Sequence, residues 1–314
     1  MKAILLKQIG GVENFLIKDI KKPDIKENEV LISVKAISVN PVDFKARIIE
    51  NLLTSLIGEQ RPAIIGWDIS GTIVAIGNKV TKFEIGDNVF SMVNFPGSGK
   101  AYAEFVAAPE DQLAKIPKKT SFNEAAATTL AAVTALQILK PRVKKGDRVL
   151  IHGGSGGVGH FAIQIAKSLD AYVISTSSAK NKDFILSLGA DEHINYNSQK
   201  FEEILTDVDF VLDMFNGDIL LNSIKITKMG GTIISLPTPD FSDEILKLAK
   251  ERNIDVSFTT VQSNGDDMNT LKNMLESGAI QPHISKTFAF EKMGDAHLQL
   301  ESGRTVGKVI VTVK

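Results

Sequence analysis

The chain has 314 residues, of which 43% are hydrophobic and 23% are charged, and its formal net charge is −1. This size and composition are typical of a soluble protein with two domains, and the near-zero charge argues against a nucleic-acid or anionic-membrane partner. The chain contains no cysteine, which excludes disulfides, cysteine nucleophiles, iron–sulfur clusters and thiolate zinc sites. Residues 1–7 lack the length and cleavage site of a signal peptide, so we expect a cytoplasmic protein.

Residues 1–120 are predicted to form a compact β-rich domain. Short runs rich in Val, Ile and alternating apolar residues are separated by turn residues such as Gly10-Gly11 and Gly77-Asn78. The runs are Lys2–Lys7, Glu29–Ala36, Gly71–Ile76, Asp87–Met92 and Ala101–Ala108.

A helix is predicted next. Ser121, with Glu124 three positions later, makes a capping box, and the apolar run Ala125–Leu139 follows it. This run is too short to span a bilayer, and we expect it to be one buried helix that joins two domains.

A glycine-rich turn follows, between the apolar strand Arg148–His152 and an amphipathic helix that begins near Val158. Gly154, Gly156 and Gly159 fit the G-x-G-x-x-G fingerprint of dinucleotide-binding proteins, in which backbone approaches a pyrophosphate and the helix N-terminus supplies N–H groups. A purely structural turn is the alternative, but the strand before it and the helix after it favour a cofactor site.

The end of the next strand, Ala171–Thr176, indicates which cofactor binds. NAD-binding proteins usually carry an acidic residue there, whereas residues 177–182 contain none. Ser177, Ser178, Lys180 and Lys182 instead offer hydroxyl and ammonium groups to a 2′-phosphate, which predicts NADPH. Alternatively, the two serines only cap the following helix.

Strands and helices then alternate, which predicts a doubly wound parallel sheet and hence an α/β fold for residues 121–265. The final strand, Gly307–Val313, has no obvious place in that sheet. We therefore expect residues 266–314 to return to the first domain. The predicted strands and helices are His193–Asn195, Phe210–Phe215, Thr232–Leu236, Val256–Val261, Met268–Gly278, Thr287–Phe290 and Glu291–Glu301.

Several motifs occur in an order that resembles the zinc-free members of the medium-chain dehydrogenase/reductase superfamily, in the quinone oxidoreductase and alkenal/enone reductase branch. The motifs are Asn40-Pro-Val-Asp-Phe-Lys45, Gly66-Trp-Asp-Ile-Ser-Gly71, Gly86-Asp87, Gly153–Gly159, Leu188-Gly-Ala-Asp191 and Gly307-Lys308. The resemblance covers essentially the whole chain. It implies a GroES-like β-barrel domain built from both ends of the chain, an inserted Rossmann domain and a homodimer.

The resemblance also implies roles for individual residues. Asn40 and Lys45 are similar to residues that face the nicotinamide and the substrate; alternatively, Asn40 is an extended residue before proline and Lys45 a solvated lysine. Other positions resemble cofactor contacts, with Thr134 alternatively bonding back to a helix carbonyl. They are Gly157 and Val158 at the pyrophosphate, Ser178, Lys182 and Tyr196 with their neighbours Ser177 and Lys180 at the 2′-phosphate, and Thr134, Asn216, Leu236, Val306 and Gly307 near the nicotinamide half.

A zinc site is not predicted. Zinc-dependent relatives hold the metal with a cysteine and with the histidine of a Gly-His-Glu motif, where this chain has Gly66-Trp67-Asp68, and its five histidines lack zinc-ligand spacing. We therefore expect an NADPH-dependent reductase of quinones or of the C=C bond of α,β-unsaturated carbonyls, with Lys45 or Asn40 stabilising the oxyanion. An NADPH-binding protein with little turnover and a zinc-independent enoyl-thioester reductase remain alternatives.

Overall fold

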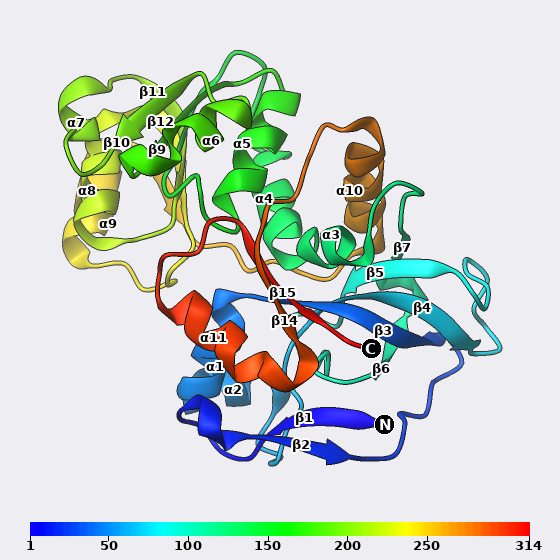
Figure 1. Cartoon of the computed structure of the whole chain (residues 1–314). Helices are drawn as coiled ribbons and strands as arrows, with labels where there is room; N and C mark the ends of the chain where they lie inside the picture. Colours follow the sequence, from blue (N-terminus) through cyan, green and yellow to red (C-terminus); the bar gives the residue numbers. More distant parts are fainter. The chain divides into compact units, whose positions relative to one another are not determined.

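Both ends of the chain fold into the same unit. The computed structural model describes residues 1–314, and these divide into unit 1, residues 1–133 and 261–314, and unit 2, residues 134–260 (Figure 1). Residues 121–133 and 261–265, predicted from the sequence to belong to the nucleotide-binding domain, lie in unit 1. The first of these segments stays there because its helix packs on strands of that unit.

Unit 1 contains a two-stranded and a seven-stranded sheet. The larger sheet has the order β14-β15-β3-β4-β5-β7, with β6 pairing with β3, and β15 runs antiparallel to β3. The last strand, β15, thus lies beside β3 from the first part of the chain. The strands are β1 (Lys2–Leu6), β2 (Phe15–Asp19), β3 (Glu29–Val39), β4 (Asp68–Ile76), β5 (Asn88–Met92), β6 (Phe105–Pro109), β7 (Ala114–Lys115), β14 (Ile284–Ala289) and β15 (Lys308–Thr312).

The helices of unit 1 include two that were not predicted, α1 and α2. Asn40 is extended and stands before Pro41, and its backbone N–H donates to the Asp43 carboxylate at 2.6 Å, which fixes the start of α1. The helices are α1 (Pro41–Ile48), α2 (Glu50–Ile57), α3 (Phe122–Ala127), α10 (Gly265–Ser277) and α11 (Met293–Glu301).

The single helix predicted over Ala125–Leu139 is wrong, because the structure has α3 and then α4 (Leu130–Leu139). The hydroxyls of Thr128 and Thr129 bond back to carbonyls of α3, at 2.8 and 2.7 Å. The Asp68 carboxylate accepts the N–H of Leu130 at 3.0 Å and so caps a new helix. The capping box at Ser121 is confirmed.

Unit 2 is built on a six-stranded parallel sheet of order β10-β9-β8-β11-β12-β13. This is the 3-2-1-4-5-6 order of a doubly wound sheet. In such sheets ligands bind beyond the carboxyl ends of the two central strands, here β8 and β11, where the strand order reverses. The elements are β8 (Arg148–Ile151), α5 (Gly159–Ser168), β9 (Tyr172–Ser177), α6 (Lys182–Ser187), β10 (Glu192–Asn195), α7 (Phe201–Ile204), β11 (Val208–Asp213), α8 (Gly217–Ile226), β12 (Thr227–Ser235), α9 (Asp243–Glu251) and β13 (Asp255–Ser257).

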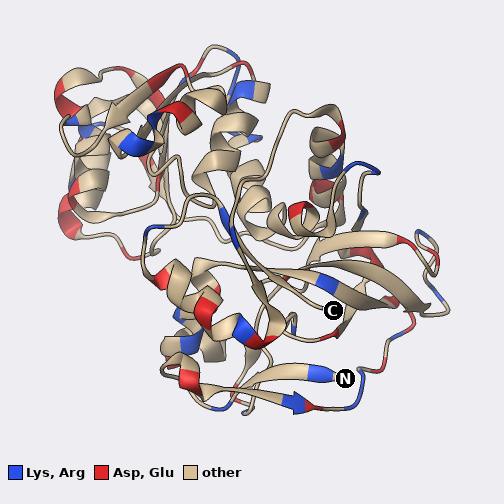
Figure 2. Cartoon of the chain, viewed as in Figure 1, with Lys and Arg blue, Asp and Glu red and all other residues tan.

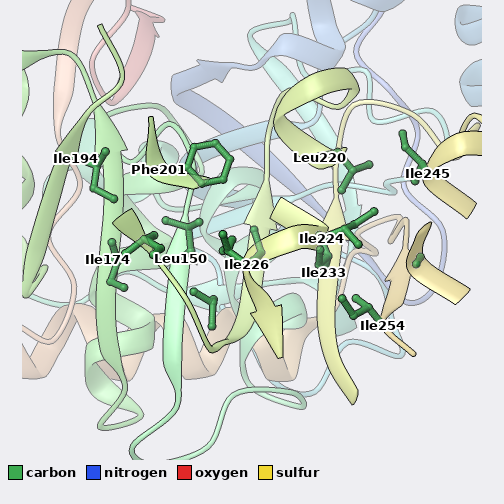
Figure 3. Close-up of a cluster of buried hydrophobic side chains, with 14 residues drawn as sticks. Leu150, Ile174, Ile194, Phe201, Leu220, Ile224, Ile226, Ile233, Ile245 and Ile254 are labelled. Atoms are coloured by element: carbon green, nitrogen blue, oxygen red, sulfur yellow. The ribbon is translucent and has the colours of Figure 1, made fainter. Parts of the chain in front are cut away.

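The sheet of unit 2 is buried on both faces. On one face Leu150 and Ile174 pack with Leu220 and other side chains of α7, α8 and α9 (Figure 3). Neighbours of Leu150 in β8, such as Val149, point to the opposite face and are equally buried. The core therefore leaves the carboxyl ends of the strands, with their polar residues, as the edge at which a ligand can bind.

Blue and red segments are interspersed in both units, without a broad region of one sign in this view (Figure 2). No helix has the length and apolar character needed to cross a bilayer.

Candidate cofactor and active site

The glycine-rich turn lies at the carboxyl end of β8. A Cβ built on Gly154 would overlap the Oγ of Ser175 in β9, and one on Gly159 would overlap the carbonyl oxygen of Gly153. Only glycine lets the turn lie this close to β9 and to the start of α5. The glycines of the predicted fingerprint thus form a backbone cradle, with Val158 as the N-cap residue of α5.

The next strand holds the turn in place. The backbone N–H of Gly154 donates to the carbonyl of Thr176 at 3.0 Å, and that of Gly153 donates to the Thr176 hydroxyl at 3.2 Å. The Asn181 amide donates to the Ser155 hydroxyl at 2.9 Å. The turn after β8 and the turn after β9 are therefore joined, which pre-organises both for one ligand.

The polar side chains of residues 177–182 differ in how far they are exposed to solvent. Ser177 is buried, and its hydroxyl donates to the carbonyl of Ser178 at 3.0 Å. Ser178 is partly exposed and its side chain caps no helix, so the capping alternative is not supported. Lys180 and Lys182 are exposed.

Tyr196 follows β10 and is 58% exposed, and its backbone N–H donates to the carbonyl of Ser177 at 3.2 Å. The residues predicted for the 2′-phosphate thus gather at the ends of two neighbouring strands, β9 and β10.

Asp213 organises the end of β11, a role that was missed in the sequence. Its carboxylate accepts the backbone N–H groups of Phe215 and Asn216, at 3.0 and 2.9 Å, and the Ser235 hydroxyl at 2.7 Å. Its carbonyl accepts the N–H of Leu236. An Asp that ends an apolar strand before Phe-Asn-Gly is the signal that could have revealed it.

Asn216 is held in a strained conformation with φ of +65°, and its buried Oδ1 has no hydrogen-bond partner in the protein. A buried acceptor without a partner is unfavourable, so this atom fits a ligand that brings a donor. Together with the cradle, it makes unit 2 suitable for a dinucleotide.

In unit 1, Asn40 lies in a buried polar cluster that also contains Asp68 and Lys308. The Asn40 amide donates to Asp68 at 2.8 Å and accepts a hydrogen bond from the Lys308 ammonium. Asn40 is 1% exposed and Lys308 2% exposed. The side-chain amide nitrogen of Asn40 is therefore already engaged in a hydrogen bond within the protein.

Two carboxyl groups share this cluster with one ammonium group. Burial and then the charge of Asp68 raise the pKa of Asp43 to about 7. Burial also raises the pKa of Asp68, while it lowers the pKa of Lys308. Two buried anions and one cation leave one negative charge, which a proton on Asp43 removes.

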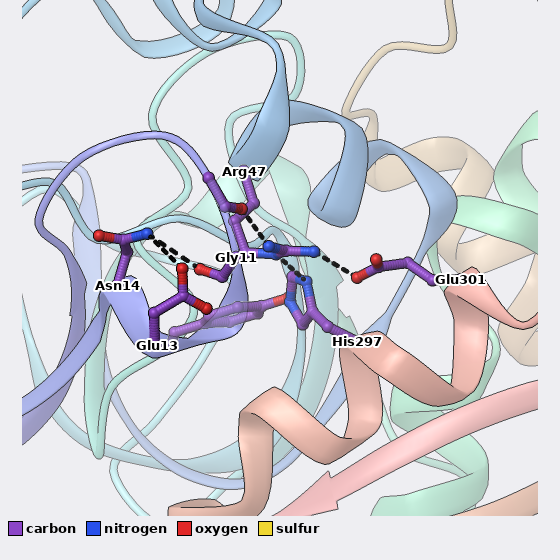
Figure 4. Close-up of polar contacts among 8 residues, drawn as sticks. Gly11, Glu13, Asn14, Arg47, His297 and Glu301 are labelled. Atoms are coloured by element: carbon purple, nitrogen blue, oxygen red, sulfur yellow. Dashed lines mark hydrogen bonds and ion pairs between the residues drawn. The ribbon is translucent and has the colours of Figure 1, made fainter.

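A chain of contacts runs from Asp43 through Tyr102 and His297 to Arg47. Figure 4 shows His297, Arg47 and Glu301 of this chain. Arg47 Nε donates to His297 Nδ1 at 3.4 Å, so the ring proton is on Nε2, which donates to the Tyr102 hydroxyl at 2.8 Å. Burial, followed by the charge of Arg47, lowers the pKa of His297 to about 3. Arg47 also bonds the carbonyl of Gly10 and pairs with Glu301.

The other predicted positions are distributed over both units. Lys45 lies on α1, half-buried, and its ammonium group makes no hydrogen bond or ion pair within the protein. Thr134 is buried in α4, and Val306 is partly exposed beside the buried Gly307 just before β15. Gly307 has φ of +68°, and a Cβ there would overlap the carbonyl of His283.

Trp67 lies in the segment Gly66-Trp67-Asp68, which we compare with the Gly-His-Glu motif of zinc-dependent relatives. Its indole is fully buried, donates to the carbonyl of Gly97 at 2.6 Å and packs edge-on against Phe95. No three His, Asp or Glu side chains come together as a metal site. The residues present therefore do not fit a zinc ion.

Two family models match parts of the chain. Residues 26–118 match the alcohol dehydrogenase GroES-like domain, and residues 188–311 match the zinc-binding dehydrogenase family. The chain is 34% identical to 2-methylene-furan-3-one reductase of Solanum lycopersicum, over 99% of this chain and 79% of that protein. It is 31% identical to the NADPH-dependent alkenal/one oxidoreductase of Arabidopsis thaliana, over 99% and 79%.

The solved structure of the quinone oxidoreductase from Coxiella burnetii is similar throughout, with a TM-score of 0.91 and 36% identity over 100% of this chain and 99% of that one. The predicted fold class, a GroES-like domain with a Rossmann-type parallel sheet, is confirmed. The chain belongs to the medium-chain dehydrogenase/reductase family, among relatives that are oxidoreductases.

Proposed function

We propose that the protein is an NADPH-dependent reductase of quinones or of the C=C bond of α,β-unsaturated carbonyl compounds, and that it works without zinc. The observation that carries this proposal is the glycine cradle of unit 2, with its joined turns and the unpartnered Oδ1 of Asn216. The names of the curated relatives support the same class of substrate.

The preference for NADPH rests on the charges at the end of β9. Residues 177–182 carry two lysines and no carboxylate, so a 2′-phosphate meets ammonium groups and the unused hydroxyl of Ser178. A ribose without the phosphate finds no acidic acceptor there. When bound, NADPH supplies the hydride.

We propose a reaction without zinc because other residues stand at the positions where zinc ligands are expected. Trp67 fills the histidine position, and the chain has no cysteine. Asp68 already accepts hydrogen bonds from the Asn40 amide and from the backbone N–H of Leu130. A family description that mentions zinc therefore does not carry over to this chain. Without such a Lewis acid, simple alcohols and saturated ketones are expected to be poor substrates.

Lys45 is the stronger candidate for stabilising the oxygen of the substrate. Reduction of a conjugated C=C bond leaves enolate charge on the carbonyl oxygen, and a buried donor to such an oxygen typically contributes about 2.7–4 kcal/mol. The Asn40 amide donates to Asp68, whereas the ammonium group of Lys45 has no partner in the protein. We assign Asn40 the role of fixing the start of α1, on which Lys45 lies.

The test is turnover, measured as NADPH consumption on a panel of enones, enals and quinones, with ethanol and a saturated ketone as controls. We expect steady consumption on the conjugated substrates in the presence of a chelator. Tight NADPH binding by fluorescence quenching, with no turnover on any conjugated substrate, would instead favour a binding protein. Activity on ethanol alone would contradict the assigned chemistry.

A further inference from the structure

His193 lies beside the proposed 2′-phosphate site and has no role in the function proposed above. It lies on β10, and its Nε2 is 2.9 Å from the hydroxyl oxygen of Ser177. Since successive side chains of a strand alternate, His193 points away from Ile194, which packs in the core of Figure 3. It therefore lies on the face of the sheet opposite that core, where its ring contacts the Ser177 hydroxyl at the end of β9.

The hydrogen bonds at Ser177 define the tautomer of His193. The Ser177 hydroxyl has one proton, and that proton is donated to the carbonyl of Ser178 at 3.0 Å. In this arrangement the oxygen accepts from His193, and we assign the ring proton to Nε2. The atom left to bind a further proton is Nδ1.

The charges around His193 are positive or already paired. Partial burial and then the charge of Lys182 on α6 lower the pKa of His193 below its usual 6.5. The acidic neighbours on its own chain segment have other partners: Asp191 pairs with Lys167 at 2.8 Å, and Glu192 accepts from the Tyr172 hydroxyl at 2.7 Å. From β9 the neutral hydroxyl of Ser177 contacts the ring, and the residue opposite His193 in the register is the neutral Ser175. His193 is thus neutral near pH 7. An anion bound beside it would raise its pKa.

We propose that His193 is part of the 2′-phosphate site and takes up a proton when that phosphate binds. The inference rests on the NADPH preference proposed above. A phosphate monoester carries about −1.5 to −2 charges near pH 7, enough to offset the repulsion from Lys182 and to favour the imidazolium. The charged ring then donates a charge-assisted hydrogen bond, so His193 adds to the discrimination between NADPH and NADH.

The sign of the pH dependence follows from proton uptake. A ligand that is bound together with a proton loses affinity as the pH rises, by up to about tenfold per pH unit between the pKa of the free and of the liganded histidine. The second ionisation of the phosphate, with a pKa of about 6, acts in the opposite direction at lower pH. Measurements from pH 7 to 8, where the phosphate is almost entirely in its doubly charged form, therefore report mainly on the histidine.

The experiment is calorimetric titration of the full-length protein in buffers of different ionisation enthalpy, which counts the protons taken up per ligand. NADPH and NADH are titrated into the wild type and into His193→Gln, whose amide keeps an N–H donor but cannot titrate near neutral pH. We expect about half a proton to one proton per NADPH at pH 7 for the wild type, none for NADH, and none for either ligand in the variant.

The possible failures are distinguishable. If the wild type binds NADPH and NADH equally well, the proposed cofactor preference is wrong and the phosphate site with it. If NADPH is preferred but His193→Gln takes up as many protons as the wild type, only the assignment of His193 is overturned. NADH binding and the Tm of the variant verify its fold, and His193→Asn replaces it if either is disturbed.

Discussion

Replacement of Asp43 by Asn tests the buried cluster of unit 1 through the pH dependence of stability. In the unfolded chain this carboxyl group ionises near its ordinary pKa of 3.8, whereas the folded protein raises that pKa to about 7 through burial and the charge of Asp68. Between these values the folded state holds a proton that the unfolded state has released. The free energy of unfolding therefore falls by about 1.4 kcal/mol for each pH unit of increase, or about 4 kcal/mol over the whole window.

In Asp43→Asn this contribution is absent, while the amide oxygen still accepts the N–H of Asn40, which lies 2.6 Å from the carboxylate in the wild type. The assay is urea unfolding from pH 5 to pH 6.5, followed by the fluorescence of Trp67, the single tryptophan of the chain and a residue of unit 1. We expect the difference in unfolding free energy, wild type minus variant, to fall by about 2 kcal/mol over this range.

His297 acts in the opposite direction. Its pKa is lowered to about 3, so the unfolded state binds a proton below pH 6.5 that the folded state does not, and stability decreases as the pH falls. This contribution is common to the wild type and the variant and cancels in their difference. Asp19→Asn, at an exposed position of β2, controls for the change in net charge. Parallel stability curves for wild type and Asp43→Asn would refute the protonated state of Asp43.

Four further predictions concern the cofactor and the reaction. Lys45→Ala should lower kcat by about ten- to a thousandfold with little effect on NADPH affinity, and a loss of NADPH affinity instead would place Lys45 on the cofactor. NADPH should bind about a hundredfold more tightly than NADH, since the phosphate contacts contribute about 2–3 kcal/mol, and equal dissociation constants would contradict this. Elemental analysis should find no stoichiometric zinc, and activity should survive a chelator; one zinc per chain would refute the proposal. Gly154→Ala should abolish NADPH binding because its Cβ would overlap Ser175. Gly156→Ala, whose Cβ would lie 3.2 Å from the nearest atom, should weaken NADPH binding less, and equal losses of affinity in titrations would show that close packing at Gly154 is not required for binding.

The sequence predicts the parallel sheet and the glycine cradle well because their signals are local. Apolar runs with turn residues between them locate most strands, and the strand–turn–helix context locates the cradle. The short helices α1 and α2 were missed because eight residues give little periodicity, and their boundary at Ile49 lacks a glycine or a proline. The break at Thr128 and Thr129 depends on Asp68, which is remote in the sequence.

The buried cluster of unit 1 could not be predicted from the sequence. Asn40, Asp68 and Lys308 are separated by 28 and 268 positions, counted from Asn40, and come together only through the pairing of β3 with β4 and β15. The sequence suggested Asn40 as a donor to the substrate, because nothing local shows that its amide is engaged by Asp68. The predictions for cytoplasmic location, a homodimer and the individual cofactor contacts stay predictions.

The position of β15 also determines the order in which the chain can fold during synthesis. Residues 134–260 are contiguous, so the parallel sheet of unit 2 has all its strands before residues 261–314 leave the ribosome. Unit 1 begins first but finishes last, since β3 lacks its neighbour, and Asn40 its ammonium partner, until residues 308–312 emerge. In the interval, residues 36–39 of β3 offer unpaired backbone groups to other chains on the side that β15 later covers. We therefore expect that β3, which is synthesised early, is prone to aggregate in the nascent protein. This exposure ends when β15 pairs with it.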